Sequence, residues 1–304
     1  KSKGNVVDPW SVLNKQGADA LRWYLLTATQ PGNVRRFSVD QVQETIKGFL
    51  LTLWNTYSFF VTYANIDKYE PVALPENSEL PELDRWIISE LNLLMQEVDR
   101  ELGAYNTTQA GRAIEDFVEY LSNWYVRRSR RRFWKSEDDS DKRAAYATLY
   151  TCLTTLAHVI APFMPFLAEE MYQNLILSVN PSAVPSIHLR DFPRASPEKI
   201  NIKLSQEIRL VMKISSLGRA ARSKANIKVR QPISLALIKV KDDRERKALE
   251  RLSAQLLEEL NIKGMEFISD KSTVMDIQVS ADMSLIGPKY GKKAGEIASL
   301  LKSM

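Results

Sequence analysis

Apolar residues recur along most of this chain with the spacing that amphipathic helices require. In one long stretch Val42, Ile46 and Phe49 fall on the same helical face. The stretches with this pattern are residues 39–66, 82–102, 107–134 and 144–176. Because the connections between them are short, neighbouring helices can run in opposite directions. The pattern predicts an antiparallel helical bundle, with its fourth helix kinked or interrupted at Pro162 and Pro165.

Shorter elements flank the predicted bundle. Asp8 and Pro9 are typical of a helix start and Gly17 of its end, and a second short helix follows over residues 18–30. After Pro197 the pattern changes to a basic helix, short strands and further helices. The helices are expected at 203–224, 243–260 and 291–304, and the strands at 233–240, 264–269 and 274–280. We therefore expect a mainly α fold in three parts: residues 1–37, a helical domain over 38–195, and a small mixed α/β domain over 196–304.

Composition narrows the function classes. Hydrophobic residues make up 44% and charged residues 26% of the chain, which is ordinary for a globular protein. No apolar stretch is long enough to span a membrane, and no leader peptide is recognised. With one cysteine in the chain, a reducing, cytoplasmic compartment is expected. The single cysteine, Cys152, lies in an apolar helical stretch and excludes an internal disulfide and a cysteine-based zinc site. The two histidines, His158 and His188, lie far apart without carboxylates at ligand spacing. The chain assembles no complete active site.

The densest cluster of charge is the run SNWYVRRSRRRFW, with five arginines between Arg127 and Arg132. One interpretation is a solvated face that pairs with the acidic residues just downstream. The other is a phosphate contact, because planar guanidinium groups bind phosphates with two hydrogen bonds. Tyr125 and Trp134 could stack on bases, although aromatic residues at such positions more often belong to a core. Val126 and Phe133 are expected to pack on the bundle.

A second basic cluster, GRAARSKANIKVRQP, lies in the predicted α/β domain. It could equally be a solvated surface. Two such clusters in different domains suit a long, structured polyanion, of which tRNA is the natural candidate. The opening Lys-Ser-Lys-Gly-Asn could bind a triphosphate, but short basic loops of this kind are common and usually just solvated.

The segment KSKGNVVDPWSVLNKQGADALRWYLL resembles the continuation of the KMSKS signature in class I aminoacyl-tRNA synthetases, with Lys1 and Ser2 as its last two residues. LLTLWNTYSFFVTYANID, LSNWYVRRSRRRFW, APFMPFLAEEMYQNL and GRAARSKANIKVRQP resemble isoleucyl-tRNA synthetases, in the variety found in archaea and eukaryotes. Valyl-tRNA synthetases share part of these motifs and remain an alternative. So does a helical scaffold or interaction module that binds no RNA.

The resemblance implies which steps this chain would support and which steps the rest of an intact enzyme would carry out. An intact enzyme of this family would activate isoleucine with ATP and Mg²⁺ and charge tRNA(Ile), with its catalytic and editing domains before Lys1; the present chain would be inactive alone. Residues 1–37 would be the end of the KMSKS loop and a stem-contact segment, and 38–195 the anticodon-binding domain. Lys1 and Ser2 would contact ATP phosphates in the intact enzyme, and no zinc is expected. The predicted RNA-binding residues are Arg127, Arg128, Arg131, Arg132, Lys135, Arg219, Arg222, Lys224, Lys228 and Arg230.

Overall fold

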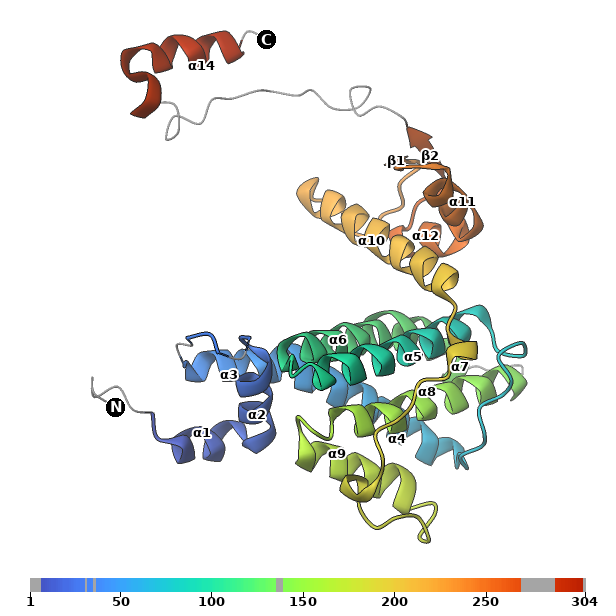
Figure 1. Cartoon of the computed structure of the whole chain (residues 1–304). Helices are drawn as coiled ribbons and strands as arrows, with labels where there is room; N and C mark the ends of the chain where they lie inside the picture. The colour runs from blue at the N-terminus through green and yellow to red at the C-terminus, as the bar shows by residue number, and fades with distance from the viewer. Residues whose placement is uncertain (1–6, 31, 35–36, 135–138, 269–287, 303–304) are drawn as a thin grey trace. The chain divides into compact units, whose positions relative to one another are not determined.

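The computed structural model divides the chain into two compact units, residues 1–205 and 206–304, each described separately below (Figure 1). It describes residues 7–30, 32–34, 37–134, 139–268 and 288–302. The predicted strand at 274–280 lies outside these residues. The separation of residues 1–37 from the bundle and the boundary between 195 and 196 stay predictions.

Unit 1 begins with three short helices: α1 (Pro9–Gln16), α2 (Ala18–Thr27) and α3 (Val39–Thr45). Asp8 caps α1 by accepting a hydrogen bond from the Trp10 amide at 3.2 Å, as the sequence predicts. Gly17 alone joins α1 to α2, with a positive φ of 83° that favours glycine. Val12, Ala20 and Val42 pack in one small core, so the three helices form a single body.

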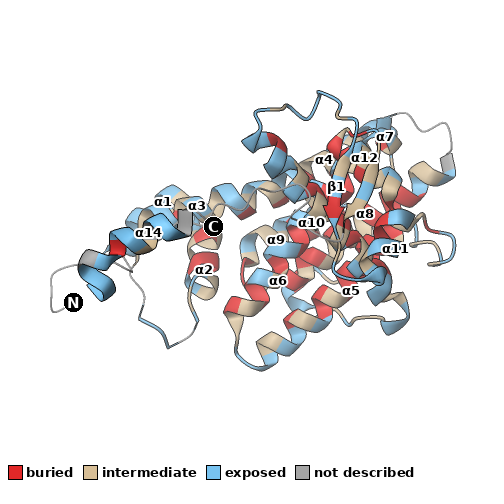
Figure 2. Ribbon diagram, turned by 90° about the horizontal axis from the view of Figure 1, so that it is seen from above, coloured by how far each residue is buried: buried red, intermediate tan, exposed pale blue. Residues whose placement is uncertain are grey.

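The bundle follows, with α4 (Leu51–Asp67), α5 (Glu82–Gly103), α6 (Thr107–Glu119), α7 (Arg127–Trp134), α8 (Asp139–Ile160) and α9 (Pro165–Tyr172). Helix α5 packs on α6 and α8, and α8 also packs on α4 and α7. Figure 2 shows buried positions as stripes along these helices, with exposed positions on their other sides. The predicted break of the fourth helix is present, because α8 ends before Pro162 and Pro165 starts α9. Cys152 is fully buried, as its place in an apolar helical stretch suggests.

Two of the predicted continuous helices contain π-helical segments, which the periodicity does not reveal. Segment η1 (Ile46–Leu50) separates α3 from α4, and η2 (Tyr120–Val126) separates α6 from α7. A π segment widens the helix locally and shifts the angular register of the residues after it. In η2 three successive residues, Trp124, Tyr125 and Val126, are all buried. A further π segment, η3 (Gln173–Leu177), follows α9. The short 3₁₀ turns η4 (Ile187–Leu189) and η5 (Pro197–Lys199) lie in residues 178–201, which connect η3 to α10.

Unit 2 is a small α/β arrangement. Helix α10 (Ile202–Lys224) begins at the end of unit 1 and continues into unit 2, followed by β1 (Ala236–Lys239), α11 (Asp243–Arg251), α12 (Ser253–Leu260) and β2 (Met265–Ile268). The strands pair in parallel, with Ala236 opposite Met265 and Lys239 opposite Ile268. A parallel pair needs a crossover, which α11 and α12 provide. The 3₁₀ turn η6 (Gly291–Lys293) and α14 (Ala294–Lys302) follow in the last described stretch. The predicted mixed α/β character is confirmed.

Candidate nucleic-acid interface

Helix α7 contains the arginine run, and two buried residues show which side of this helix faces the bundle. Phe133 is 2% exposed, with its ring centroid 5.1 Å from Phe59 and 4.8 Å from Tyr146. Ser129, one turn earlier, is fully buried. At about 100° per residue, these two positions direct Arg127, Arg131 and Trp134 away from the bundle, and the exposed Arg130 lies at the flank of the helix beside Trp134. The predicted packing of Val126 and Phe133 on the bundle is confirmed.

Arg132 differs from its neighbours because it points into the bundle. Its Nη1 and Nη2 donate to Oδ1 and Oδ2 of Asp84, both at 2.7 Å, and its Nε donates to Asp141 Oδ2 at 3.0 Å. Burial alone would lower the pKa of Arg132, but the hydrogen bonds and the charge of Asp84 raise it. The ion pairs therefore satisfy the guanidinium from within the protein. Arg132 was predicted to bind RNA, and the structure instead gives it a structural contact.

Tyr125 belongs to the same buried network. It is fully buried, and its hydroxyl donates to Asp84 Oδ1 at 2.6 Å. Burial, together with the negative charge of Asp84, raises the pKa of the phenol well above its ordinary value. Of the two interpretations of Tyr125, the core one is confirmed, and the ring is not available for a base to stack on.

The outer side of α7 combines cations with one exposed aromatic ring. The guanidinium carbons of Arg127 and Arg128 lie 5.7 and 5.4 Å from the centroid of the buried Trp124 ring, within cation–π range. Arg130 and Arg131 are exposed and make no ion pair within the part of the chain that the structure describes. Trp134 is 54% exposed beside them. Helical spacing places Trp134 between the arginines, a pattern typical of surfaces on which unpaired bases stack.

Arg130 is absent from the predicted RNA-binding residues, although it lies on this same side. Its position on a helical wheel could have identified it, because at helical spacing Arg130 lies on the side of α7 opposite Arg132. Lys135, which was predicted to contribute, lies outside the described residues, as do Lys1 and Ser2.

The second cluster, in unit 2, separates in the same way into one buried and several exposed cations. Arg222 is 5% exposed, and its guanidinium donates to four backbone carbonyls. These are Gln231 at 2.8 Å, Lys228 at 3.1 Å, Leu260 at 2.7 Å and Asn261 at 3.0 Å. Two of them belong to the C-terminal end of α12, where carbonyls lack helical partners. Arg222 was predicted to bind RNA, but it joins α10, the 225–231 loop and α12.

The other four members of this cluster are exposed. Arg219 forms an ion pair with Glu259, whose carboxylate is 3.1 Å away. Lys224, Lys228 and Arg230 lie at the end of α10 and in the loop that follows it. Three cations on a short stretch, with one more paired beside them, make a second basic surface.

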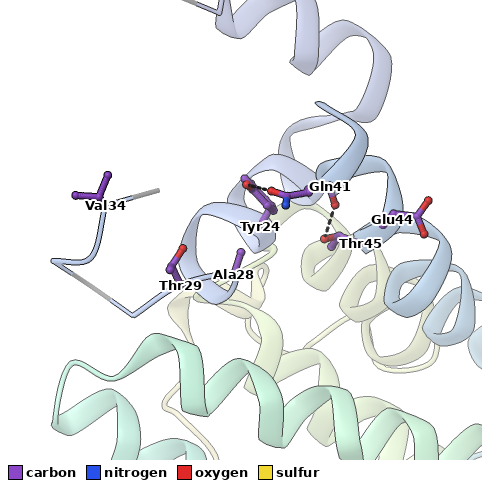
Figure 3. Close-up of a pocket in the computed structure, with 7 residues that line it drawn as sticks. All are labelled: Tyr24, Ala28, Thr29, Val34, Gln41, Glu44 and Thr45. Atoms are coloured by element: carbon purple, nitrogen blue, oxygen red, sulfur yellow. Dashed lines mark hydrogen bonds between the residues drawn. The ribbon is translucent and has the colours of Figure 1, made fainter. Parts of the chain in front are cut away.

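One pocket of unit 1 has no cation among its described lining residues. This pocket of about 450 Å³ lies between the C-terminal end of α2 and α3. Figure 3 shows the residues that line it. Its described lining offers polar groups but no lysine or arginine: Tyr24, Ala28, Thr29, Val34, Gln41, Glu44 and Thr45. The Tyr24 hydroxyl is already donated to Gln41 Oε1 at 2.6 Å. Phosphate recognition calls for cations or free backbone amides. The described lining of this pocket therefore supplies no cation for a phosphate.

The side chains that commonly bind metals are scattered rather than clustered. Among the described residues, no three His, Cys, Asp or Glu side chains are grouped so that they could hold a metal ion. His158 lies in α8 with its Nδ1 2.8 Å from the Thr154 carbonyl oxygen, so its imidazole has a partner within its own helix. None of the helices in the described stretches is both long and apolar enough to cross a bilayer.

Comparison with known proteins identifies two matching families. A family model described as the anticodon-binding domain of tRNA ligase matches residues 84–237, about half of the chain. A second, described as tRNA synthetases class I (I, L, M and V), matches residues 1–38. The first match contains α7 and its arginines, and it extends through α10 and the exposed loop of unit 2.

Curated relatives match almost the whole chain. An isoleucine–tRNA ligase of Dehalococcoides mccartyi is 59% identical over 275 residues, which is 90% of this chain and 27% of the relative. Those of Thermus thermophilus and Clostridium novyi are 46% and 45% identical, over 99% and 100% of this chain and 29% of each relative. The chain thus spans less than a third of the length of these relatives. The predicted resemblance to isoleucyl-tRNA synthetases is confirmed. All three relatives are bacterial, so the predicted archaeal and eukaryotic variety is not supported.

Proposed function

This chain belongs to the family of anticodon-binding domains of tRNA ligases, and we propose that it is the tRNA-binding part of an isoleucine–tRNA ligase. The observation that carries the proposal is the identity of 46% to 59% with isoleucine–tRNA ligases along 90% to 99% of the chain. The proposed partner is tRNA(Ile), bound through its anticodon arm. A helical scaffold that binds no RNA is disfavoured, because such a role gives no reason for this family match.

The outer side of α7 supports a contact with RNA. Arg130 and Arg131 offer guanidinium groups that no described carboxylate occupies, and the exposed indole of Trp134 lies among them. Guanidinium groups bind backbone phosphates, while an exposed aromatic ring accepts an unpaired base. The anticodon loop presents both chemistries. Lys224, Lys228 and Arg230 of unit 2 supply a second set of phosphate contacts.

The intact protein is proposed to activate isoleucine with ATP and Mg²⁺ and to transfer it to tRNA(Ile) in the cytoplasm. Lys1 and Ser2 would contact ATP phosphates there, in line with the match of residues 1–38 to class I synthetases. In this proposal the residues of this chain recognise and position tRNA(Ile). The chain by itself is expected to show no isoleucine-dependent ATP–pyrophosphate exchange.

Filter binding with a tRNA(Ile) transcript over a series of salt concentrations tests the RNA contact. The variant Arg130→Gln with Arg131→Gln should weaken binding roughly tenfold, and the slope of log affinity against log salt should fall by about one for each phosphate that is no longer neutralised. The matched control is Arg246→Gln with Lys247→Gln, which removes two charges that already pair with Glu250 and Asp243 on α11. An equal decrease in affinity in the two variants would contradict a contact at α7.

A second variant separates stacking from charge. Trp134→Ala leaves every arginine in place, and stacking of one base on an aromatic ring is worth about 1–3 kcal/mol. Its affinity for tRNA(Ile) should therefore fall at least about fivefold, with an unchanged salt slope. Tighter binding of tRNA(Val) than of tRNA(Ile) would favour the valyl alternative, and the absence of RNA binding would favour the scaffold.

A further inference from the structure

A groove of about 1050 Å³ lies in unit 2 between α10 and β1. Sites that bind small ligands commonly measure about 300–1000 Å³, so the groove has room for such a molecule. Its lining is mostly aliphatic and includes Ile214 and Leu217 of α10 and Leu235 and Leu237 at β1. Leu217 is 58% exposed, Leu237 44% and Leu235 41%, so these apolar side chains are accessible to a ligand.

The charges of the groove have one sign. Among the described residues, its charged lining residues are Arg222, Lys239 and Lys241, with no aspartate or glutamate. The guanidinium of Arg222 is already occupied by four backbone carbonyls. Lys239 and Lys241 are exposed and form no ion pair within the described stretches of the chain. This arrangement favours a ligand that is anionic and also has an apolar part.

The groove adjoins the second basic surface through the loop after α10. Asn226 has a positive φ of 55°, which turns the chain at the end of this helix. Ala225 and Ile227, on either side of Asn226, line the groove. Lys224 precedes these two residues and Lys228 follows them, and both lysines are exposed. A ligand that lies along this loop therefore meets cations and the opening of the apolar groove together.

Single-stranded RNA combines the two chemistries that this surface offers. Its phosphates carry negative charge, and an unpaired base has an apolar face that aliphatic side chains can cover. Bases inside a duplex are stacked on their neighbours, so only an unpaired base can enter a groove. The family model for anticodon-binding domains extends to residue 237, so the match includes α10, the 225–231 loop and Leu237.

We propose that this groove binds an unpaired nucleobase of the tRNA whose phosphates contact the second basic surface. The inference rests on the proposed function and adds to it a site for a base in unit 2. Lys224 and Lys228 neutralise phosphates at the loop, while Leu217 and Leu237 cover the base. Removing these apolar contacts lowers the affinity for tRNA but leaves the number of neutralised phosphates unchanged, so the salt slope stays the same.

The test is filter binding of a tRNA(Ile) transcript to the 304-residue chain over a series of salt concentrations. The double variant Leu217→Gln with Leu237→Gln replaces two lining residues by polar side chains of similar length. Its Kd should rise at least about fivefold, the lower end of what one stacked base contributes, with an unchanged salt slope. Leu217→Met with Leu237→Met keeps the apolar lining and should bind within about twofold of the wild type.

The matched control is Ile202→Gln with Leu189→Gln. These residues are 51% and 69% exposed and lie outside the groove, and Ile202 belongs to the same helix α10. Hydrogen exchange of the amides in α12 and β2 shows whether unit 2 keeps its fold. If the double glutamine variant loses this protection, Leu217→Gln alone, at an exposed helical position, takes its place.

Transcripts that lack one base test the ligand itself. An abasic nucleotide, placed at each unpaired position of the tRNA in turn, keeps the phosphate and removes the base. One such transcript should bind the wild-type chain about fivefold more weakly than the complete transcript. The same transcript should bind the double glutamine variant no more weakly than the complete one does, because the two changes remove a single contact.

Three results have different consequences. If the double glutamine variant binds tRNA(Ile) as tightly as the control variant, the inference is overturned while the proposed function stands, and the groove then serves a protein segment or no ligand. If every abasic transcript loses as much affinity for the double glutamine variant as for the wild type, the inference is overturned as well. If the wild-type chain does not bind tRNA(Ile), the proposed function fails and the inference with it.

Discussion

Arg132 and Asp84 face each other across the bundle through two parallel hydrogen bonds of 2.7 Å, from α7 to the first turn of α5. Asp84 has no exposed surface, and the hydroxyl of Tyr125 donates to it as well. Burial of a carboxylate is costly unless it is paired and hydrogen-bonded, and these donors supply the partners. The pair therefore fastens the arginine-bearing helix to the core, while Arg130 and Arg131 stay on the surface.

Replacing Arg132 should destabilise unit 1 strongly. Arg132→Met leaves the buried Asp84 charge without its cation, and breaking a buried pair in this way costs about 3–5 kcal/mol. All six tryptophans lie in unit 1, so urea unfolding followed by tryptophan fluorescence reports this unit alone. The control Arg131→Met should stay within about 0.5 kcal/mol of the wild type, as is usual for surface positions. Similar destabilisation in the two variants would contradict the assignment of Arg132 to the core.

The crossing of α2 and α6 should not tolerate a methyl group at Gly111. A Cβ at this position would lie 2.3 Å from Cγ2 of Thr27, a β-branched side chain with little freedom to move. Gly111→Ala should therefore destabilise unit 1 by about 1–3 kcal/mol, the usual cost of overpacking, although alanine normally favours a helix. Thr27→Ser removes the nearest clashing atom and keeps the hydroxyl, while Cβ of residue 27 stays 2.9 Å away, so the double variant should recover part of the stability. Gly48→Ala, with open space around it, is the control. A destabilisation that Thr27→Ser does not relieve would rule out this clash.

The contrast between adjacent arginines shows what the sequence could and could not predict. Periodicity was sufficient to predict the helices. It also predicted which side of α7 faces the bundle, because the apolar residues Val126 and Phe133 mark that side. It could not separate Arg132 from Arg131. The distinction depends on Asp84, which precedes Arg132 by 48 residues and meets it only in the folded bundle.

Arg222 and the π segments illustrate the same limit. The acceptors of Arg222 include carbonyls at Leu260 and Asn261, and backbone carbonyls leave no mark in a residue pattern. The π segments change the register of helices whose apolar spacing still reads as continuous. The residue pattern along the chain therefore predicted the helices, the strands and the basic clusters. Tertiary interactions determine which arginines and lysines remain available to a ligand.

Arg222 should stabilise unit 2 rather than bind RNA. Arg222→Met removes four hydrogen bonds to carbonyls. A hydrogen bond made by a charged group contributes about 1.5–3 kcal/mol net, and contributions within one network do not simply add. We expect unit 2 to be destabilised by about 2–4 kcal/mol, near the upper range of single substitutions. Because unit 2 has no tryptophan, hydrogen exchange of the amides in α12 and β2 is the measurement. Lys228→Met, at an exposed position, is the control, and unchanged protection in Arg222→Met would contradict this role.

His158 should make unit 1 less stable as the pH falls below its ordinary pKa of 6.5. Burial lowers the pKa of the imidazole in the folded chain, the Thr154 carbonyl opposes this shift, and Arg190 adds to it. Below pH 6.5 the unfolded chain therefore binds the proton more readily, so stability is complete above that pH and decreases as the pH drops towards the lowered folded value. His158→Gln removes the titration, and its Tm should fall less than that of the wild type between pH 7.5 and 5.5. A difference of 1 kcal/mol moves Tm by about 2–4 °C in a domain of this size, which tryptophan fluorescence resolves. His188→Gln removes an exposed imidazole and should follow the wild type; identical curves for all three proteins would show that burial of His158 has no effect on stability.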